Sequence, residues 1–373
     1  MRGRAHRLVS GGATLAAALL LAAVGPPASA APPVGGYTRT LLTVGAPDVP
    51  SPFIPSTTGN PVNGAGLVAG SATIYGFRSP TDAGVYNLTT GTWTDLGTFG
   101  SSNEARAADV NEGGDVVGAA GTDIGSGSPT RAFLWTPERP TLLDLGSLDP
   151  LDRQSGATAV NDHGVVVGWT YTPDSGYTGH AFLWDPKASP LGMRDLGTLG
   201  GVDSVAYGIN NAGTVVGSAT TRRRVVRPFV WTPAAHAMVD IGTLPGYDSG
   251  VARDVNDRGY VVGEDFNAAT PDDTRAFLWN PVTHAVTALN APAGQASRAY
   301  AINHYGVIVG RVNYPPIEGS SSPDSKVAIW RGCTPLTVLP EDYATATGIT
   351  RRERIVGTSI DGGASWLKAG PCT

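Results

Sequence analysis

Short apolar segments recur along the chain at a regular interval and alternate with turns rich in Gly, Asn and Pro. The clearest marker is Val or Ile followed by Asn, with Gly three and seven residues after the Asn. A seventh, degraded copy has Thr350 in the Asn place. The spacing of 46 to 50 residues fits four strands of about five residues with short connections, and Asn-x-x-Gly favours a type I turn. The complete copies are centred on Asn63, Asn111, Asn161, Asn210, Asn256 and Asn303.

Each unit contains four elements that we predict to be strands. The first ends at the Asn and has Ala four residues before it in six copies, which indicates crowding of an innermost strand. The second is apolar without alternation, as in Val116–Gly118, which is typical of a strand buried on both faces. The third is exemplified by Ala132–Trp135 and the fourth by Asp144–Gly146. Each unit is therefore expected to fold as one four-stranded sheet.

The phase of the repeat differs at the two ends of the chain. The first strand-like segment, Thr40–Val44, resembles a fourth element, whereas the last, around Trp366, resembles a third element. An N-terminal outer strand could pair with the C-terminal third strand, and such closure removes open sheet edges. The sequence therefore predicts an all-β fold: a seven-bladed β-propeller of four-stranded blades, closed by one N-terminal strand that completes the last blade.

The N-terminus has the features of a secretory signal peptide. Three arginines precede an uncharged apolar run, Ala13–Val24, that is too short to span a bilayer, and Ala28–Ala30 supplies small residues for cleavage. We assign residues 1–30 to a cleaved signal peptide and residues 31–373 to the propeller domain. No second apolar stretch could span a membrane and no lipid-bearing Cys follows the leader, so we expect a secreted, extracellular protein without a membrane span.

Charge and cysteine content narrow the possibilities further. Without the leader, 23 basic and 31 acidic residues leave a net charge near −8, which argues against nucleic acid as a partner. Cys333 and Cys372 are the two cysteines of the chain, and an oxidising compartment favours a disulfide between them that holds the C-terminus. Two free thiols or a metal pair are the alternatives.

The unit resembles the extracellular HAF repeat family. The His-Ala-Phe tripeptide of that family stands here as His180-Ala181-Phe182, and residues 195–217 match the wider signature almost throughout. The resemblance covers residues 38 to 370, with departures at Tyr86 and Thr350 in the terminal repeats. It implies a secreted bacterial repeat protein and supplies no activity.

No complete catalytic constellation is visible. Ser359–Trp366 resembles the Asp-box of sialidase-type propellers, but that box is a turn motif, and the arginine cluster and nucleophile pair of a sialidase are not found. The carboxylates around Asn111 and Asn256 lack the alternation and the closing Glu of a calcium loop. The histidines lack paired spacing. We therefore predict no catalytic residue, no metal and no cofactor.

One recurring feature is not explained by turn formation: a basic residue precedes the third strand in five copies. Together with an exposed arginine loop and Trp169, these residues could bind an anionic or glycan ligand, because Arg forks acidic groups and aromatic rings stack on sugars. The favoured alternative is that each basic residue pairs with the Asp of the adjacent fourth strand. The candidate ligand-binding residues are Arg131, His180, Arg227, Arg275, Lys326, Arg222, Arg223, Arg224 and Trp169.

Two functional classes follow from these observations. The first is a non-catalytic binding or scaffold protein, expected to be a monomer, whose partner is an unidentified extracellular glycan, wall polymer or protein. The second is a polysaccharide-directed hydrolase or lyase with its site on the loop face, which requires carboxylates or a His that converge at the channel mouth.

Overall fold

The computed structural model describes residues 37–44, 51–73, 81–100, 102, 104–122, 130–149, 154–172, 179–188, 192–315, 323–332 and 334–368. These residues form 29 β-strands and no helix, and hence no helix among them is long and apolar enough to cross a membrane. The predicted signal peptide and the predicted disulfide, Cys333 with Cys372, lie outside the described residues.

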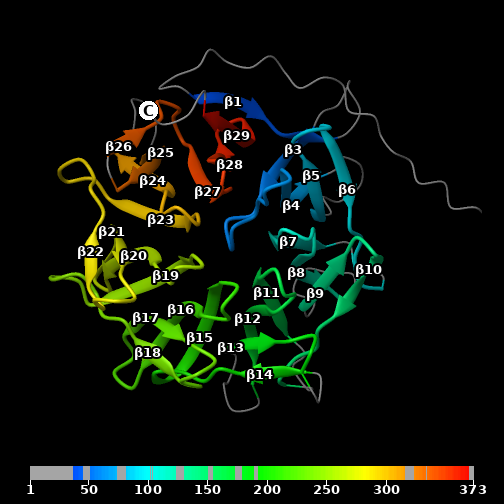
Figure 1. Ribbon diagram of the computed structural model, residues 1–373, viewed down its shortest axis with the longest axis horizontal. Coiled ribbons are helices and arrows are strands. Elements are labelled where there is room, and N and C mark those ends of the chain that lie inside the picture. Colours follow the sequence, from blue (N-terminus) through cyan, green and yellow to red (C-terminus); the bar gives the residue numbers. More distant parts are fainter. Residues whose placement is uncertain are drawn as a thin grey trace, which may run out of the picture.

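Seven antiparallel blades surround a central channel (Figure 1), which confirms the predicted fold class. Each of blades 2 to 7 has its first strand innermost and its fourth strand outermost. Blade 1 is β2 (Thr43–Val44), β3 (Ser51–Pro55), β4 (Leu67–Thr73), β5 (Thr81–Asn87) and β6 (Thr92–Asp95); blade 2 is β7 (Ala105–Val110), β8 (Val116–Gly121), β9 (Thr130–Thr136) and β10 (Arg139–Asp144); blade 3 is β11 (Ser155–Val160), β12 (Val166–Tyr171), β13 (Gly179–Trp184) and β14 (Met193–Asp195); blade 4 is β15 (Gly200–Ile209), β16 (Val215–Thr221), β17 (Val226–Trp231) and β18 (Met238–Asp240). Blade 5 is β19 (Ser249–Val255), β20 (Val261–Asn267), β21 (Thr270–Trp279) and β22 (Val286–Ala288); blade 6 is β23 (Ser297–Ile302), β24 (Ile308–Tyr314), β25 (Asp324–Arg331) and β26 (Thr334–Val338); blade 7 is β27 (Thr345–Ile349), β28 (Arg354–Ser359), β29 (Gly362–Lys368) and β1 (Tyr37–Leu41).

The ring closes through the N-terminus, as the repeat phase predicted. Strand β1 pairs antiparallel with β29, from Tyr37 opposite Lys368 to Leu41 opposite Ala364, and these two strands lie side by side in Figure 1. The predicted strand Thr40–Val44 is wrong in one respect, because its last two residues form β2 and pair with β3 in blade 1. Leu42 and Val44 are buried in a hydrophobic cluster formed by residues of blades 7 and 1. Their burial holds the segment that connects β1 of blade 7 to β2 of blade 1.

A β-bulge interrupts the inner strand of blades 2 to 7 at the residue three before the Asn or Thr anchor. The preceding Ala lies opposite the Gly of the second strand, for example Ala107 opposite Gly118. A Cβ added to Gly118 would lie 2.0 Å from the carbonyl oxygen of Arg106 and 2.9 Å from the ring of Phe133. The crowding inferred from the recurring Ala is therefore confirmed, and the facing Gly has the same cause.

The core is divided among the interfaces between successive blades. In blades 2 to 5 the Phe of the third strand is fully buried, and each such side chain contributes about 2 kcal/mol of burial free energy. Phe229, for example, packs with Ala206 and Val215 of its own blade and with Val167 and Ala181 of blade 3. Each blade thus buries its third strand against its neighbour, and this fixes the inner strands around the channel.

Blade 1 departs from the predicted repeat. Its inner strand β3 ends at Pro55, and of the residues just before Asn63 only Val62 forms a bridge, to Val68. The intervening segment, Ser56–Asn60, turns into the channel, where a Cβ on Gly59 would lie 2.6 Å from the carbonyl oxygen of Thr158 in blade 3. Pro55 and Pro61 lack the backbone N–H that a continuous strand would use, which explains the interruption.

Candidate functional site

The anchor asparagines form a ring at one mouth of the channel, which we call the Asn mouth. The Asn111 side chain has two roles: its Oδ1 accepts the N–H of Asp115 at 2.8 Å, and its Nδ2 donates to the carbonyl oxygen of Asn161 in the next blade at 3.0 Å. The first bond is the predicted turn chemistry, whereas the second joins neighbouring blades and was not foreseen. All six asparagines make the inter-blade bond, at 2.9 to 3.2 Å.

Asn60 completes the ring where Thr350 has no amide to donate. Its Nδ2 donates to the carbonyl oxygen of Ile349 at 3.1 Å, and its Oδ1 accepts the N–H of Ile349 at 2.8 Å. The degraded seventh turn also has Glu353 in the Gly place, with a φ of 59°, and its carboxylate pairs with Arg331 at 2.7 Å. The insertion in blade 1 therefore compensates for the defect in blade 7.

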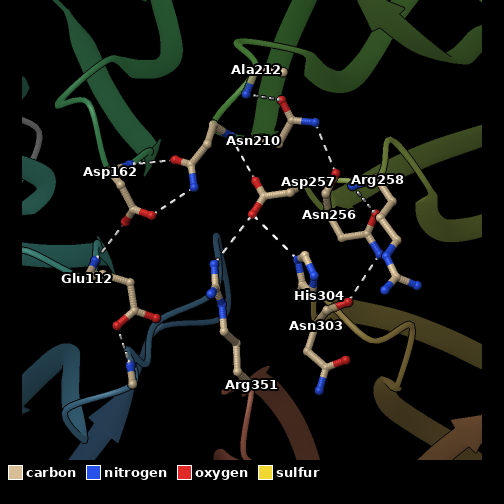
Figure 2. A network of polar contacts seen from close by, with 12 residues as sticks. Glu112, Asp162, Asn210, Ala212, Asn256, Asp257, Arg258, Asn303, His304 and Arg351 are labelled. Atoms are coloured by element: carbon tan, nitrogen blue, oxygen red, sulfur yellow. Dashed lines mark hydrogen bonds and ion pairs between the residues drawn. The ribbon is translucent and has the colours of Figure 1, made fainter.

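A cavity of about 140 Å³ opens at the Asn mouth, and all seven blades contribute to its lining, together with Gly59 and Asn60. The residues that follow the anchors form its rim, which Figure 2 shows as a chain of polar contacts. The Gly64 N–H donates to Glu112 at 2.9 Å, the Glu112 N–H to Asp162 at 3.0 Å, the Asp162 N–H to Asn211 at 2.9 Å, and the Asn211 N–H to Asp257 at 3.1 Å.

An arginine and a histidine lie beside this acidic rim. Asp257 Oδ2 lies 3.8 Å from His304 Nδ1 and 3.7 Å from Arg351 Nη2, and the three side chains face one another in Figure 2. The rim residues share one position of the repeat, directly after the anchor, so an alignment of the seven units would have brought them together. Their different side chains hid this relation.

Two buried carboxyl groups line the cavity below the rim. Asp109 accepts the N–H groups of Val110 at 2.8 Å and of Val160 in the next blade at 2.9 Å. Burial raises the pKa of Asp109 to about 8, against the opposing effect of these backbone donors. Asp254 occupies the same place in blade 5 and accepts N–H groups from Val255 and from Ile302 of blade 6.

Burial likewise raises the pKa of Asp254 to about 6. A general acid, base or nucleophile must present an oxygen to the substrate. Both oxygens of Asp109 and of Asp254 instead accept backbone N–H groups, one of them from the next blade. Their geometry is that of bonds between blades.

The turn carboxylates rejected as calcium ligands are also engaged within the turn. Asn111 Nδ2 donates to Asp115 Oδ2 at 2.9 Å, in addition to the bond from the Asp115 N–H to Asn111 Oδ1. Among the described residues, no group of three or more His, Cys, Asp or Glu side chains is placed to hold a metal ion.

We call the opposite mouth of the channel, where the inner strands begin, the basic mouth, after Arg298 and Arg311 of blade 6; the buried carboxyl groups of Glu264 and Asp265 of blade 5 also lie there. The bulges aim Tyr207, Arg253 and Tyr300 from successive blades at one another. The Arg253 guanidinium lies 4.9 Å from the centre of the Tyr207 ring and 6.0 Å from that of Tyr300. It also holds Glu264 with two nitrogens, the shortest distance being 2.6 Å.

The basic residues before the third strand make the pairs of the favoured alternative in three blades. Arg131 pairs with Asp144 at 3.1 Å, His180 with Asp195 at 2.9 Å, and Arg227 with Asp240 at 2.9 Å. In each pair the Asp lies on the fourth strand of the same blade. The hydrogen bond to Asp195 raises the pKa of His180. These charges are therefore compensated within their own blades.

The other two basic residues of this set, Lys326 and Arg275, do not pair with an Asp of the fourth strand. Lys326 pairs with Asp342 at 2.6 Å and lies 3.4 Å from Asp324. Arg275 has Ala288 rather than Asp on the fourth strand of its blade, and no hydrogen bond or ion pair of Arg275 is seen within the described part of the chain.

The remaining candidates lie in two separate places. Arg222, Arg223 and Arg224 are exposed on the turn between β16 and β17, and Arg224 adopts a φ of 60°. Trp169 is half-buried on β12, 5.7 Å from the Tyr171 ring and directly opposite Gly156 of the inner strand. Trp169 thus belongs to the basic mouth, apart from the arginine turn.

No family model matches the sequence, and neither does any curated protein. The fold is similar to the β-propeller domain of the trilobed protease from Pyrococcus furiosus, with a TM-score of 0.53 and 10% identity over 86% of this chain and 98% of that one. That domain is described as having an open velcro topology, whereas β1 closes the ring here.

Two enzymes share the propeller. An oligogalacturonate lyase in complex with manganese has a TM-score of 0.51 and 13% identity over 93% of this chain and 97% of that one. An acylaminoacyl peptidase from Pyrococcus horikoshii has a TM-score of 0.51 and 11% identity over 82% of this chain, which spans only 49% of the peptidase. At these identities the comparisons show that the chain has a β-propeller fold.

Proposed function

We propose that this chain is a secreted, non-catalytic β-propeller of the extracellular HAF repeat type that binds an extracellular glycan, wall polymer or protein at a mouth of its channel. The observation that supports this proposal best is the hydrogen bonding of the two buried carboxyl groups in the cavity. Asp109 and Asp254 are the carboxyl groups with perturbed pKa values in the cavity, and both spend their oxygens on backbone N–H groups of their own and the next blade. Neither of these two buried carboxyl groups therefore has a free oxygen for a substrate, whereas Asp265, near the start of the inner strand of blade 5, has a buried Oδ1 without a hydrogen-bond partner among the described residues.

A polysaccharide-directed hydrolase or lyase is the competing function. Its support is the pKa of Asp254, which burial raises to about 6, a value suited to a general acid near neutral pH. In that case a substrate would have to displace the N–H of Ile302 from the carboxyl group. With Asp254 as the acid, the competing function therefore requires the inter-blade bond to open during the reaction.

The test uses the chain from residue 31 onward and a panel of cell-wall polymers and polysaccharides. Retention of the protein on each polymer is measured beside the release of reducing ends and unsaturated products from the same samples. We expect retention on at least one polymer with no products. Products that disappear in Asp254→Ala, with folding retained, would establish the enzyme; the absence of both retention and products would refute a polymer-binding role.

A further inference from the structure

Two arginines face each other at the basic mouth, and neither has an acidic partner among the described residues. Arg298 on β23 lies directly opposite Arg311 on β24, so their side chains project from the same face of the sheet with Cβ atoms about 5 Å apart. Arg298 Nε makes one long hydrogen bond, 3.4 Å to Thr274 Oγ1. Arg311 Nε is buried and has no hydrogen-bond partner. Two like charges directly opposite each other destabilise a sheet, so this pair needs another explanation.

The equivalent positions in blades 2, 3, 4, 5 and 7 contain no such pair. They are Gly156 opposite Trp169, Val205 opposite Ser218, Val251 opposite Glu264, Arg106 opposite Ala119, and Thr345 opposite Thr358. In blade 5 the guanidinium at this level, that of Arg253, has Glu264 as its partner. Within the described residues, blade 6 thus carries a local excess of positive charge where the repeat does not demand it.

The pair is accessible to solvent, and one tyrosine lies near it in the sequence of β23. Arg298 and Arg311 are both partly exposed, and Tyr300 lies two residues after Arg298 on the bulge that aims it into the channel. Inner strands run from this mouth to the Asn mouth, so Arg298 lies five residues, about 15 Å, from the Asn303 anchor and the acidic rim. Arg298, Arg311 and Tyr300 thus lie apart from the rim carboxylates of the Asn mouth.

We propose that Arg298 and Arg311 bind the carboxylates of an acidic polysaccharide, a polymer containing uronic acid, at the basic mouth. This inference rests on the proposed binding function and adds the ligand class and the residues. Guanidinium groups hold carboxylates in a fork that lysine does not reproduce, and the ring of Tyr300 can stack on the apolar face of a sugar. The bound carboxylate supplies the negative charge that the sheet itself lacks at this pair.

The test measures the affinity of the chain for polygalacturonate by titration calorimetry. The double variant Arg298→Gln/Arg311→Gln is expected to bind at least tenfold more weakly, with a smaller dependence on salt. Arg298→Lys/Arg311→Lys keeps the charge and should recover only part of the affinity. Arg131→Gln removes the same charge from a compensated pair and should change affinity less than twofold. Fully methyl-esterified polygalacturonate should not bind the wild type, and polyphosphate should bind weakly and equally to all variants.

Stability provides an independent readout. Because the glutamines remove repulsion between unpaired cations, the double variant should melt at or above the temperature of the wild type while it loses affinity. Unchanged affinity for polygalacturonate in the double variant, or no binding of polygalacturonate by the wild type, would overturn this inference and leave the proposed function to the polymer panel. Tight binding of polyphosphate, lost in the double variant, would replace the uronic acid by a phosphate polymer. Cleavage of polygalacturonate would overturn the proposed non-catalytic function.

Discussion

Asn210→Asp separates the two roles of an anchor asparagine. The side chain is 4% exposed, its Oδ1 accepts the N–H groups of Ala212 and Thr214, and its Nδ2 donates to the carbonyl oxygen of Asn256 in the next blade. The introduced carboxyl group keeps the turn acceptor but turns an oxygen toward that carbonyl oxygen. Loss of the bond costs about 1 kcal/mol, and an unpaired buried acceptor adds about 1 to 3 kcal/mol. We therefore expect a loss of about 2 to 4 kcal/mol in the free energy of unfolding.

The loss can be read as a melting temperature. An unfolding entropy of about 2.1 cal/mol/K per residue makes 1 kcal/mol equal to about 1.4 °C in a propeller of this length, so melting should fall by about 3 to 6 °C at pH 7. Burial beside a carbonyl oxygen raises the pKa of the introduced carboxyl group above its unfolded value of about 3.9, so the deficit should grow as the pH rises above 4. At pH 4 the protonated group can donate to the carbonyl oxygen of Asn256, and the deficit should shrink.

Asn87→Asp is the matched control. Asn87 accepts the N–H groups of Thr89 and Thr90 in the same way, on an outer turn where its side chain makes no bond to another blade among the described residues. This variant should melt within about 1 °C of the wild type. Equal losses for the two substitutions, or a deficit at Asn210 that does not change with pH, would show that the inter-blade bonds do not stabilise the ring.

Two further predictions concern the buried acid and the closure. Burial raises the pKa of Asp254 to about 6, so the folded protein binds this proton more tightly than the unfolded chain does, and this group should lower the free energy of unfolding by about 2 kcal/mol as the pH rises from 4 to 7. Asp254→Ala should reduce that slope in urea unfolding, while Asp109, whose pKa burial raises to about 8, still contributes to it; an unchanged slope would contradict the prediction for Asp254. Removal of residues 31–42 leaves β29 unpaired along five residue pairs, and we expect a lower melting temperature and association through this edge in light scattering. A truncated chain that stays monomeric with an unchanged melting temperature would refute the role of β1.

The repeat could be predicted from sequence because its signals are local. Turn residues, apolar strands and the phase at the two ends each follow from neighbouring residues, and together they define seven blades and the closing strand. The interruption in blade 1 escaped this reasoning, because Asn63 still has its turn glycine while Pro61 and the inserted Asn60 change the strand before it. The motif Asn-x-x-Gly is already explained by the turn that it forms. Nothing further in the sequence therefore indicated that the same Asn side chains also bond to the next blade.

The two channel mouths were harder to foresee. Each bulge shifts the register by one residue, and only the observed shift between Ala299 and Ala301 places Arg298 opposite Arg311. The recurring basic residues before the third strand gave the stronger sequence signal, yet in three blades the structure pairs them with Asp. A periodic charge therefore marked a repeated structural bond, whereas the uncompensated charge lies at positions where the repeat is broken.

Hydrogen–deuterium exchange with and without polygalacturonate tests most directly whether the ligand binds at the basic mouth. Amides at the start of β23, in the facing part of β24 and around the bulges of β15 and β19 should exchange more slowly in the complex, while the outer strands β10, β14, β18 and β22 should be unchanged. Protection confined to the outer strands, or to the turns of the Asn mouth, would contradict the account.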